Sequence, residues 1–217
     1  MKKLNMIIMG PPGAGKGTQA KKIIARYDIP HISTGDMFRE AMEEGSPLGL
    51  LAKKYINDGH LVPDDVTIGL VKERLSKDDC AKGYLLDGFP RTIPQAEALD
   101  KLTAEIGREI SIVISIDTPK EELIRRITGR LVCKNCGAPY HKDNRKPKVE
   151  GVCDICGGQL VQRPDDNKEA LEVRLVHYDK QTKPLLEYYE KKGLVHTLDG
   201  MKGADALMDD IEKILEA

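Results

Sequence analysis

The sequence has no tryptophan and only two phenylalanines among its 217 residues. It therefore offers few of the large aromatic rings on which single-stranded nucleic acids stack. It also lacks an excess of charge, since 34 basic and 35 acidic side chains leave a formal net charge of -1. No overall charge draws the chain to nucleic acid or to an anionic membrane, so any site for a polyanion must be local.

Long apolar runs are missing as well. None approaches the roughly 20 residues that a membrane helix needs. The apolar stretch near the start gives way to Pro11 and Pro12 too soon for a signal peptide. We therefore expect a cytoplasmic protein that binds neither membrane nor nucleic acid.

The first motif present is a glycine-rich stretch. Residues 10–18 read GPPGAGKGT and follow an apolar run at 4–9. Glycines let consecutive N–H groups point at an anion, the next helix offers its positive end, and Lys16 adds a mobile charge. The spacing is that of a Walker A loop, except that Gly17 stands where the pattern has Ser or Thr. The stretch predicts a phosphate site; an ordinary strand-to-helix turn is the alternative.

Strand-like and helix-like segments alternate along most of the chain. We expect buried strands at 4–9, 83–87, 110–116 and 194–198. The alternation predicts an α/β fold of the P-loop NTPase type, with a parallel sheet, helices on both faces and ligands at the carboxyl ends of the strands.

Three local expectations are less regular. Residues 31–36 are expected to form a turn with capping residues. A helix over 66–75 is expected to follow, with Asp64 or Asp65 as its N-terminal cap. A long helical stretch is expected over 168–191, with Pro184 as a candidate break.

Two segments interrupt the alternation and predict insertions. Residues 31–63 are expected to form a small helical insertion, and residues 131–163 a subdomain rich in glycine, proline and cysteine. The remaining segments, 1–30, 64–130 and 164–217, are expected to form the core domain.

Four of the five cysteines form two Cys-x-x-Cys pairs, Cys133 with Cys136 and Cys153 with Cys156. Two such pairs complete a tetrahedral thiolate shell that leaves no open position for water. The spacing favours a structural zinc site; two redox pairs, or an iron centre with the same four thiolates, are the alternatives. Cys80 is expected to be a small buried residue.

Charged residues at strand ends and segment boundaries suggest phosphoryl chemistry. Asp87 ends a short buried strand, where P-loop proteins place a carboxylate that orients magnesium; an ordinary Asp-Gly turn is the alternative. A phosphoryl-transfer site also needs planar donors that converge on phosphate oxygens, although solvated surface arginine is the alternative for any one of them. The candidates are Arg39, Arg91, Arg126, Arg130, Arg163 and Arg174.

Together these motifs resemble the adenylate kinase family, in its long bacterial form with a zinc-bearing lid. The resemblance rests on residues 10–18, on HISTGD at 31–36, on DGFPR at 87–91 and on RPDD at 163–166, and it spans nearly the whole chain. The family's loop also has Gly-Thr after its lysine, which accounts for Gly17. The resemblance implies a monomer that transfers the γ-phosphoryl group of ATP to AMP, giving two ADP, with Mg²⁺ and a structural Zn²⁺, and so balances adenine nucleotides.

The resemblance also implies roles for individual residues. For catalysis it implies Lys16, Asp87, Arg91, Arg126, Arg163 and Arg174. For ATP it implies Gly13, Ala14, Gly15, Lys16, Gly17, Thr18, Arg126, Arg130, Pro139, Tyr140 and Lys202. For AMP it implies Thr34, Arg39, Leu61, Val62, Gly88, Arg91, Gln95, Arg163 and Arg174. Many lids of this type have three cysteines and an aspartate, whereas Cys156 here makes four thiolates.

Other functions fit parts of the sequence. GMP, CMP or UMP is an alternative acceptor, because Thr34 and Gln95 match the adenylate pattern only through single hydrogen bonds. A P-loop ATPase or GTPase switch is a second alternative, although no GTPase base-reading motif is present. A zinc-ribbon nucleic-acid module is a third, and it leaves the phosphate loop unexplained.

Two mobile covers are expected in a kinase of this kind, because ATP in open solvent would be hydrolysed. The segments 31–63 and 131–163 are the candidates, and we hypothesise that lid opening limits turnover. A phosphate acceptor is already mostly deprotonated at neutral pH, so none of the five histidines needs a catalytic role.

Overall fold

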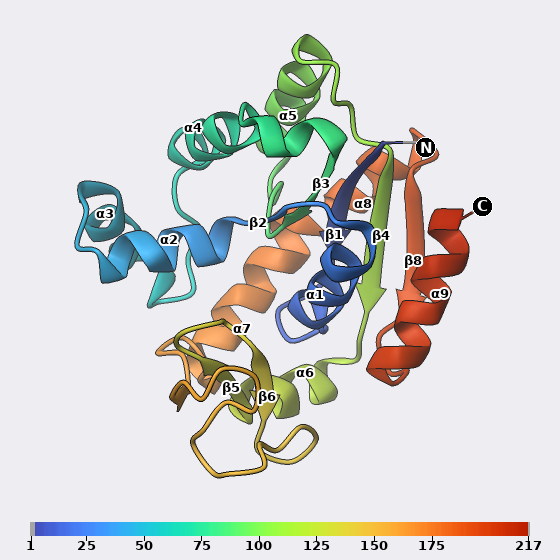
Figure 1. The fold of residues 1–217 in the computed structure, drawn as a ribbon. Helices are drawn as coiled ribbons and strands as arrows, with labels where there is room; N and C mark the ends of the chain where they lie inside the picture. The colour runs from blue at the N-terminus through green and yellow to red at the C-terminus, as the bar shows by residue number, and fades with distance from the viewer. Residues whose placement is uncertain (1–2, 217) are drawn as a thin grey trace.

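A computed structural model describes residues 3–216 and shows a parallel sheet between layers of helices (Figure 1). Residues 1–2 and 217, at the outer limits of the predicted core, lie outside the described part of the chain. The sheet has five strands, all paired in parallel. In spatial order they are β2 (His31–Ser33), β3 (Gly83–Asp87), β1 (Leu4–Met9), β4 (Ile112–Asp117) and β8 (Val195–Asp199). The predicted α/β class is confirmed.

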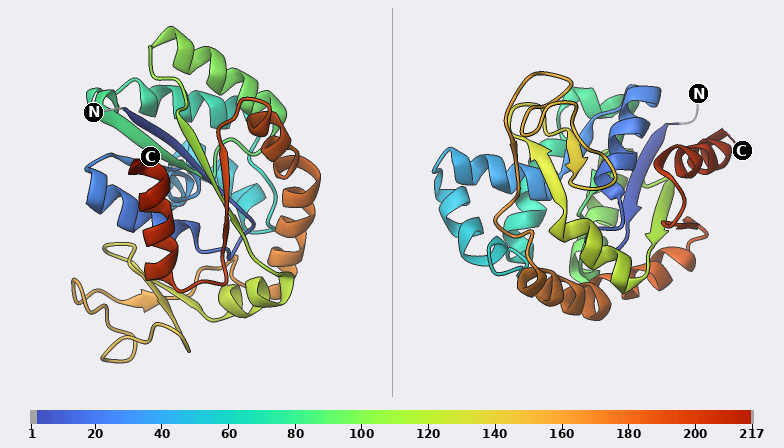
Figure 2. Two further views of the ribbon diagram at one scale, coloured as in Figure 1. Left: turned by 90° about the vertical axis from the view of Figure 1, so that its right-hand side faces the viewer. Right: turned by 90° about the horizontal axis from the view of Figure 1, so that it is seen from below.

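The helices cover both faces of this sheet, and the left view of Figure 2 shows α9 and α8 on opposite sides of it. Their bounds are α1 Lys16–Tyr27, α2 Thr34–Glu43, α3 Pro47–Ile56, α4 Asp64–Leu75, α5 Ile93–Glu105, α6 Lys120–Thr128, α7 Lys168–His177, α8 Pro184–Glu190 and α9 Ala204–Glu216. A short 3₁₀ helix over Asp78–Lys82 precedes β3.

Two apolar cores result from the alternation of side chains along the strands. Met6 and Ile8 of β1 pack into one core with residues of α1, α6, α7 and α9. Ile7 and Met9 point the other way and pack with residues of α4, α5 and α8. Because β1 is buried on both faces, the loop that follows it starts from a firmly held strand.

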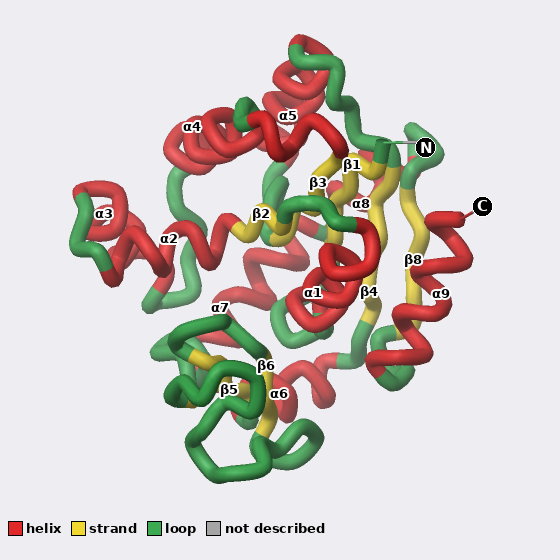
Figure 3. The backbone as a smooth tube through the Cα atoms, viewed as in Figure 1, coloured by secondary structure: helices red, strands yellow, loops and turns green. Residues whose placement is uncertain are grey.

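The cysteine-bearing segment forms a second, smaller sheet. Its antiparallel strands have the order β6 (Pro139–His141), β5 (Arg130–Cys133) and β7 (Leu160–Val161). Most of this segment is loop, as Figure 3 shows. Its own core is small and consists of Cys133, Ala138, Tyr140, Cys153 and Leu160.

The helices α2 and α3 form a pair with its own apolar cluster. Phe38, Ala52 and Val62 are buried within it. Figure 1 shows this pair on one side of the sheet and the cysteine-bearing segment below the sheet.

Two expectations from the sequence are wrong in detail, and a third is confirmed. Residues 31–33 form the edge strand β2 rather than a turn, because they pair with β3 along the sheet. The helical stretch expected over 168–191 is confirmed, since α7 continues into a π-helical turn at Tyr178–Thr182 and Pro184 begins α8. Neither Asp64 nor Asp65 caps α4, because the N-cap is Pro63 and both aspartates lie inside the first turn.

No helix within residues 3–216 is both long enough and apolar enough to cross a membrane. Cys80 is fully buried, as the sequence predicts.

Candidate functional site

The glycine-rich stretch connects β1 to α1 as a tight loop that only glycine permits. Gly10, Gly13 and Gly15 have φ angles of 142°, 88° and 101°, which L-residues with a side chain rarely adopt. A Cβ on Gly10 would lie 2.5 Å from the carbonyl oxygen of Ile116. The loop is therefore pressed against the end of β4.

Several backbone N–H groups of the loop are free to bind an anion. Within residues 3–216, those of Gly15, Lys16 and Gly17 donate to no carbonyl or side chain. Lys16 Nζ donates to the carbonyl oxygens of Gly10 and Pro11 at 2.8 and 2.9 Å. These N–H groups lie at the positive end of α1, where a phosphate binds favourably.

Lys16 is half-buried, and desolvation by the surrounding residues lowers its pKa from 10.5 to about 8. The nearby charges of Arg91 and Arg174 lower it further, while Asp87 opposes them. The ammonium is still mostly protonated at neutral pH. A phosphate would stabilise this cation, because it supplies the negative charge that the desolvated lysine lacks.

Asp87 ends β3 beside the loop and contacts a residue of the neighbouring strand. His31 Nε2 lies 3.3 Å from Asp87 Oδ2. Burial opposes ionisation of Asp87, but the hydrogen bond from His31 and the charge of Lys16 outweigh it and lower the carboxyl pKa. Asp87 therefore offers an ionised carboxylate, and Mg²⁺ prefers oxygen ligands of this kind.

In the described part of the chain, every predicted arginine except Arg91 pairs with a carboxylate, which gives a network of separate ion pairs. Asp36 Oδ1 accepts hydrogen bonds of 2.7 Å from Arg39 and 3.0 Å from Arg163. Burial opposes ionisation of Asp36, but the two guanidinium groups outweigh it and lower its pKa to about 2. The network links α2 to the end of the cysteine-bearing segment.

Two buried aspartates hold the next pair of arginines. Arg174 Nη1 donates to Asp165 Oδ2 at 2.9 Å, and Arg130 Nε donates to Asp166 Oδ2 at 2.8 Å. Burial lowers the pKa of both Arg163 and Arg174 to about 10, so both remain cations at neutral pH. Several planar cations thus converge on one region, as phosphoryl transfer requires.

Arg126 connects the phosphate loop to a distant turn. It donates to the carbonyl oxygens of Ala14 at 3.3 Å and Gly200 at 2.8 Å, and to Glu122 at 2.7 Å. The hydrogen bonds from Arg125 and Arg126 lower the pKa of Glu122 to about 2.

Two clefts meet beside this network. The first is lined by every residue predicted for AMP except Arg163, together with Phe38, Ile56 and Thr67. The second is lined by residues of the loop and its surroundings, including Gly10, Pro12 and Lys16. Both are lined by Gly59, Leu61, Gly88, Arg91 and Arg174. The two clefts therefore meet at a pair of arginines.

Three polar residues that line the first cleft are held by hydrogen bonds. Thr34 Oγ1 donates to the carbonyl oxygen of Gly88 at 3.0 Å, and so does Arg91 Nε at 2.8 Å. Gln95 Oε1 accepts a 2.7 Å hydrogen bond from the backbone N–H of Arg91.

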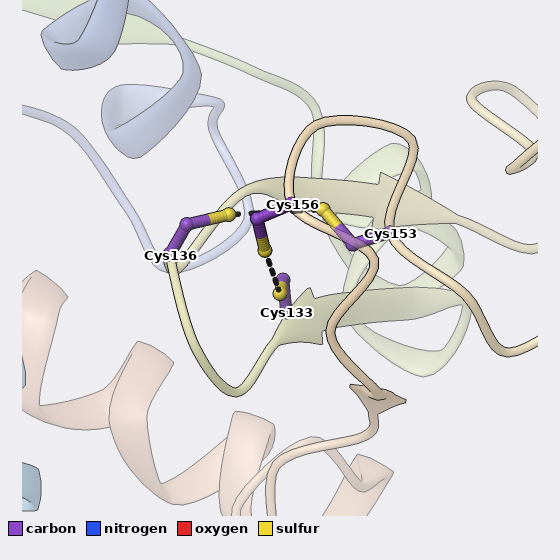
Figure 4. Close-up of side chains that lie close together, drawn as sticks. All are labelled: Cys133, Cys136, Cys153 and Cys156. Carbon is purple, nitrogen blue, oxygen red and sulfur yellow. Dashed lines mark hydrogen bonds between the residues drawn. The ribbon is translucent and has the colours of Figure 1, made fainter.

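The four clustered cysteines converge as predicted, and Figure 4 shows their sulfur atoms turned toward one another. Their Sγ atoms all lie within 4.8 Å of one another. Cys133 and Cys156 are 3.5 Å apart, and Cys136 and Cys153 are 3.7 Å apart. Four thiolates around a tetrahedral zinc ion would lie about 3.8 Å apart, so the residues fit a metal ion.

A backbone hydrogen bond further suits this cluster to a metal. The N–H of Cys136 lowers the pKa of the Cys133 thiol, which favours the thiolate form that binds metal. Cys133 and Cys153 are buried and Cys136 and Cys156 are exposed.

Three residues predicted to contact ATP line neither of the two clefts. Tyr140 is buried in the small core of the cysteine-bearing segment, and its hydroxyl lies 3.6 Å from Cys153 Sγ. Pro139 is half-buried on the same strand. Lys202 is exposed, and its side chain pairs with Asp210.

Sequence reasoning did not find the anionic and imidazole partners of the site. These are His31, Asp36, Asp64, Asp165 and Asp166. The only signal for them was their place inside the quoted motifs HISTGD and RPDD, or directly after the proline at position 63.

Comparisons with known proteins cover nearly the whole chain. A family model described as adenylate kinase matches residues 8–194. An adenylate kinase of Geobacillus sp. (strain WCH70) is 58% identical over 212 residues, which cover 98% of each chain. One of Carboxydothermus hydrogenoformans is 57% identical over 98% of this chain and 100% of the relative, and one of Methanosarcina barkeri is 54% identical over 98% and 99%. Matches of this extent, which include the phosphate loop and both clefts, show that the chain belongs to the adenylate kinase family.

Proposed function

We propose that this kinase transfers the γ-phosphoryl group of ATP to AMP across the junction of the two clefts, giving two ADP. One observation carries the proposal: the cleft beside the phosphate loop and the cleft lined by Thr34 and Gln95 share Arg91 and Arg174. A donor phosphate on the loop and an acceptor phosphate in the first cleft would therefore meet between two cations.

The donor would bind through backbone N–H groups and a mobile cation. The free N–H groups of Gly15, Lys16 and Gly17 would bind phosphate oxygens, with Gly13, Ala14 and Thr18 completing the loop. The Lys16 ammonium would leave the carbonyl oxygens of Gly10 and Pro11 for the β- and γ-phosphates. Arg126 and Arg130, together with Pro139, Tyr140 and Lys202, are proposed to surround the rest of ATP.

The acceptor needs positioning rather than a general base. The second pKa of a phosphate monoester is about 6, so its oxygens are already deprotonated at neutral pH. Arg39 and Arg91 are proposed to hold this phosphate, and Arg163 and Arg174 to contact the transferred group. These cations would neutralise charge on the equatorial oxygens in the transition state. Leu61, Val62 and Gly88 would then line the rest of the acceptor.

Two metal ions are part of the proposal. Mg²⁺ bound with ATP would neutralise phosphate charge, and the ionised carboxylate of Asp87 fits its oxygen preference. The four clustered thiolates fit a structural Zn²⁺ with a closed shell. The ion would stabilise the fold of its segment, and it would leave no position for a substrate.

The division into domains follows from the same proposal. Segments 1–30, 64–130 and 164–217 would form the core, to which β2 adds an edge strand; the rest of 31–63 would form the monophosphate-binding insertion and 131–163 the lid. The contact of Arg163 with Asp36 joins the end of the lid to that insertion. Opening of the lid is proposed to limit turnover in a cytoplasmic, monomeric enzyme of nucleotide biosynthesis.

A panel of acceptors tests the function. ADP formation from Mg²⁺-ATP is measured with AMP, GMP, CMP and UMP at equal concentrations. We expect kcat/KM for AMP to exceed that for each other monophosphate by at least about a hundred-fold, because a site that hydrogen-bonds a base rejects one that leaves its groups unpaired. ATP hydrolysis at the same rate with every acceptor, or without any, would contradict the proposal.

A further inference from the structure

Asp64 makes its side-chain contacts with α5 rather than with its own helix. Its Oδ1 accepts a 2.6 Å hydrogen bond from Gln95 Nε2, and its Oδ2 accepts a 2.8 Å hydrogen bond from Thr92 Oγ1. Thr92 also caps α5, since its hydroxyl accepts the backbone N–H of Gln95 at 3.3 Å. The carboxylate therefore joins the start of α4 to the first turn of α5.

Gln95 is held at both ends of its amide group. It is only 2% exposed, its Nε2 donates to Asp64, and its Oε1 accepts from the N–H of Arg91 at 2.7 Å. A carboxylate can only accept and a backbone N–H can only donate. A reversed amide would place an oxygen against the carboxylate and an NH₂ group against the N–H. The two partners therefore fix the orientation of the amide, which atom positions alone would leave ambiguous.

The held amide keeps two groups for a ligand. One N–H of Nε2 and one lone pair of Oε1 remain beyond the bonds to Asp64 and Arg91. Gln95 lines the first cleft together with Thr34 and Arg91. A base in that cleft would therefore meet one donor and one acceptor in a fixed order.

The order matters because adenine and guanine present opposite patterns. Adenine has a donor at its 6-amino group and an acceptor at N1, whereas guanine has an acceptor at O6 and a donor at N1. An amide in one orientation pairs with the first pattern, and a reversed amide pairs with the second. Fixing the orientation of Gln95 thus selects one purine.

We propose that Asp64 is a positioning residue that fixes the amide orientation of Gln95 and thereby sets the preference of the first cleft for adenine over guanine. The proposal rests on the proposed function, in which Gln95 faces the acceptor base. Asp64 acts only through Gln95 and leaves the transferred phosphates to the arginines.

Asp65 provides a matched control. It lies one residue further along the same first turn and carries the same charge toward the start of α4. It is exposed, and within residues 3–216 its side chain makes no hydrogen bond or ion pair. Replacing Asp65 removes the same interaction with the helix dipole as replacing Asp64, but it leaves Gln95 untouched.

The experiment measures kcat and KM for AMP and for GMP, with Mg²⁺-ATP as donor and with the full, zinc-loaded chain. For Asp64→Ala we expect the AMP-to-GMP ratio of kcat/KM to fall about ten-fold, the effect of losing one strong hydrogen bond. The KM for AMP should rise while the KM for ATP stays unchanged. Asp64→Asn keeps an acceptor for Gln95 Nε2 and should restore most of the ratio, and Asp65→Ala should leave it unchanged.

An unchanged ratio in Asp64→Ala, or an equal fall in Asp65→Ala, would overturn the proposal. Asp64→Ser, whose side chain is too short to reach Gln95, is judged by the same ratio if Asp64→Ala does not fold by circular dichroism. A wild-type chain that transfers phosphate to neither nucleotide overturns the proposed function and this inference with it. If the wild-type chain prefers AMP and a folded Asp64 variant keeps the same AMP-to-GMP ratio of kcat/KM, this inference alone is overturned.

Discussion

The phosphate loop and the cysteine-bearing segment are held in place by different means. The loop follows β1, whose side chains pack into two large apolar cores, and its glycines let it press against β4. The cysteine-bearing segment has a core of only five buried residues, two of which are cysteines. The difference indicates that packing orders the loop, whereas the order of the segment would depend on the proposed metal ion.

The largest expected effect is a loss of catalysis at the loop while the fold stays intact. Lys16→Met should lower kcat at least about a hundred-fold, the usual cost of removing one preorganised donor to transition-state charge. The melting temperature should not fall. Desolvation lowers the pKa of Lys16, which means that its positive charge destabilises the folded chain, and the substitution removes that charge. Steady-state ADP formation and calorimetry measure the two quantities.

Lys22→Met serves as the control for this variant, because Lys22 lies on the same helix and, within residues 3–216, pairs only with Asp205. It should leave kcat unchanged. A chain that unfolds when Lys16 is replaced would show that the lysine holds the loop together.

Metal removal should have the next largest effect, and it should act on the other region. Chelation, or Cys153→Ser, should unfold the cysteine-bearing segment, because its small core cannot offset the loss of the thiolate–metal bonds. Hydrogen exchange should rise over residues 131–163, while the amides of β1 and β3 stay protected.

Cys80→Ala is the matched control, because Cys80 is the one cysteine outside the cluster. This variant should retain one metal ion per chain, and Cys153→Ser should lose it. If the amides of residues 131–163 were equally protected from hydrogen exchange with and without metal, the account of this segment would be contradicted.

Gly10→Ala should have a smaller effect that tests how the loop is ordered. The new Cβ would combine a positive φ with a 2.5 Å approach to the Ile116 oxygen, so we expect the free energy of unfolding to fall by about 1–3 kcal/mol. Gly45→Ala, at a φ of 67° with no atom within 4 Å of the new Cβ, should cost less. Urea denaturation compares the two, and equal costs would show that the close approach to β4 does not matter.

The smallest expected effect concerns the ion pairs that join the cysteine-bearing segment to α2. The pKa of Asp36 is lowered from 3.8 to about 2 in the folded chain, so its contribution to stability is complete above about pH 4 and is lost as the pH falls toward 2. Its side chain is 54% exposed, so screening keeps the effect small. Asp36→Asn should flatten the fall of the melting temperature between pH 4 and 2; an unchanged slope would show that the pairs with Arg39 and Arg163 add nothing.

Much of the fold and part of the site could be predicted from local patterns. The strand at 4–9, the buried strand that ends at Asp87 and the convergence of the four cysteines are all confirmed. Each of these depends on residues close together in the sequence, or on a metal-ligand spacing that allows few geometries. The family assignment is confirmed as well.

The remaining features depend on partners far away in the chain. β2 is three residues long and is a strand only because β3 lies beside it. Asp64 looked like a helix cap because its partner, Gln95, is 31 residues away. Pairings of this kind are set by tertiary packing. The roles implied for individual residues toward ATP and AMP stay predictions.

The stoichiometry of the reaction tests the central claim most directly. ³¹P NMR of the zinc-loaded chain with Mg²⁺, ATP and AMP should show two ADP formed for each ATP and AMP consumed, without inorganic phosphate. Inorganic phosphate released from ATP at an equal rate with and without AMP would contradict a site built for transfer between two nucleotides.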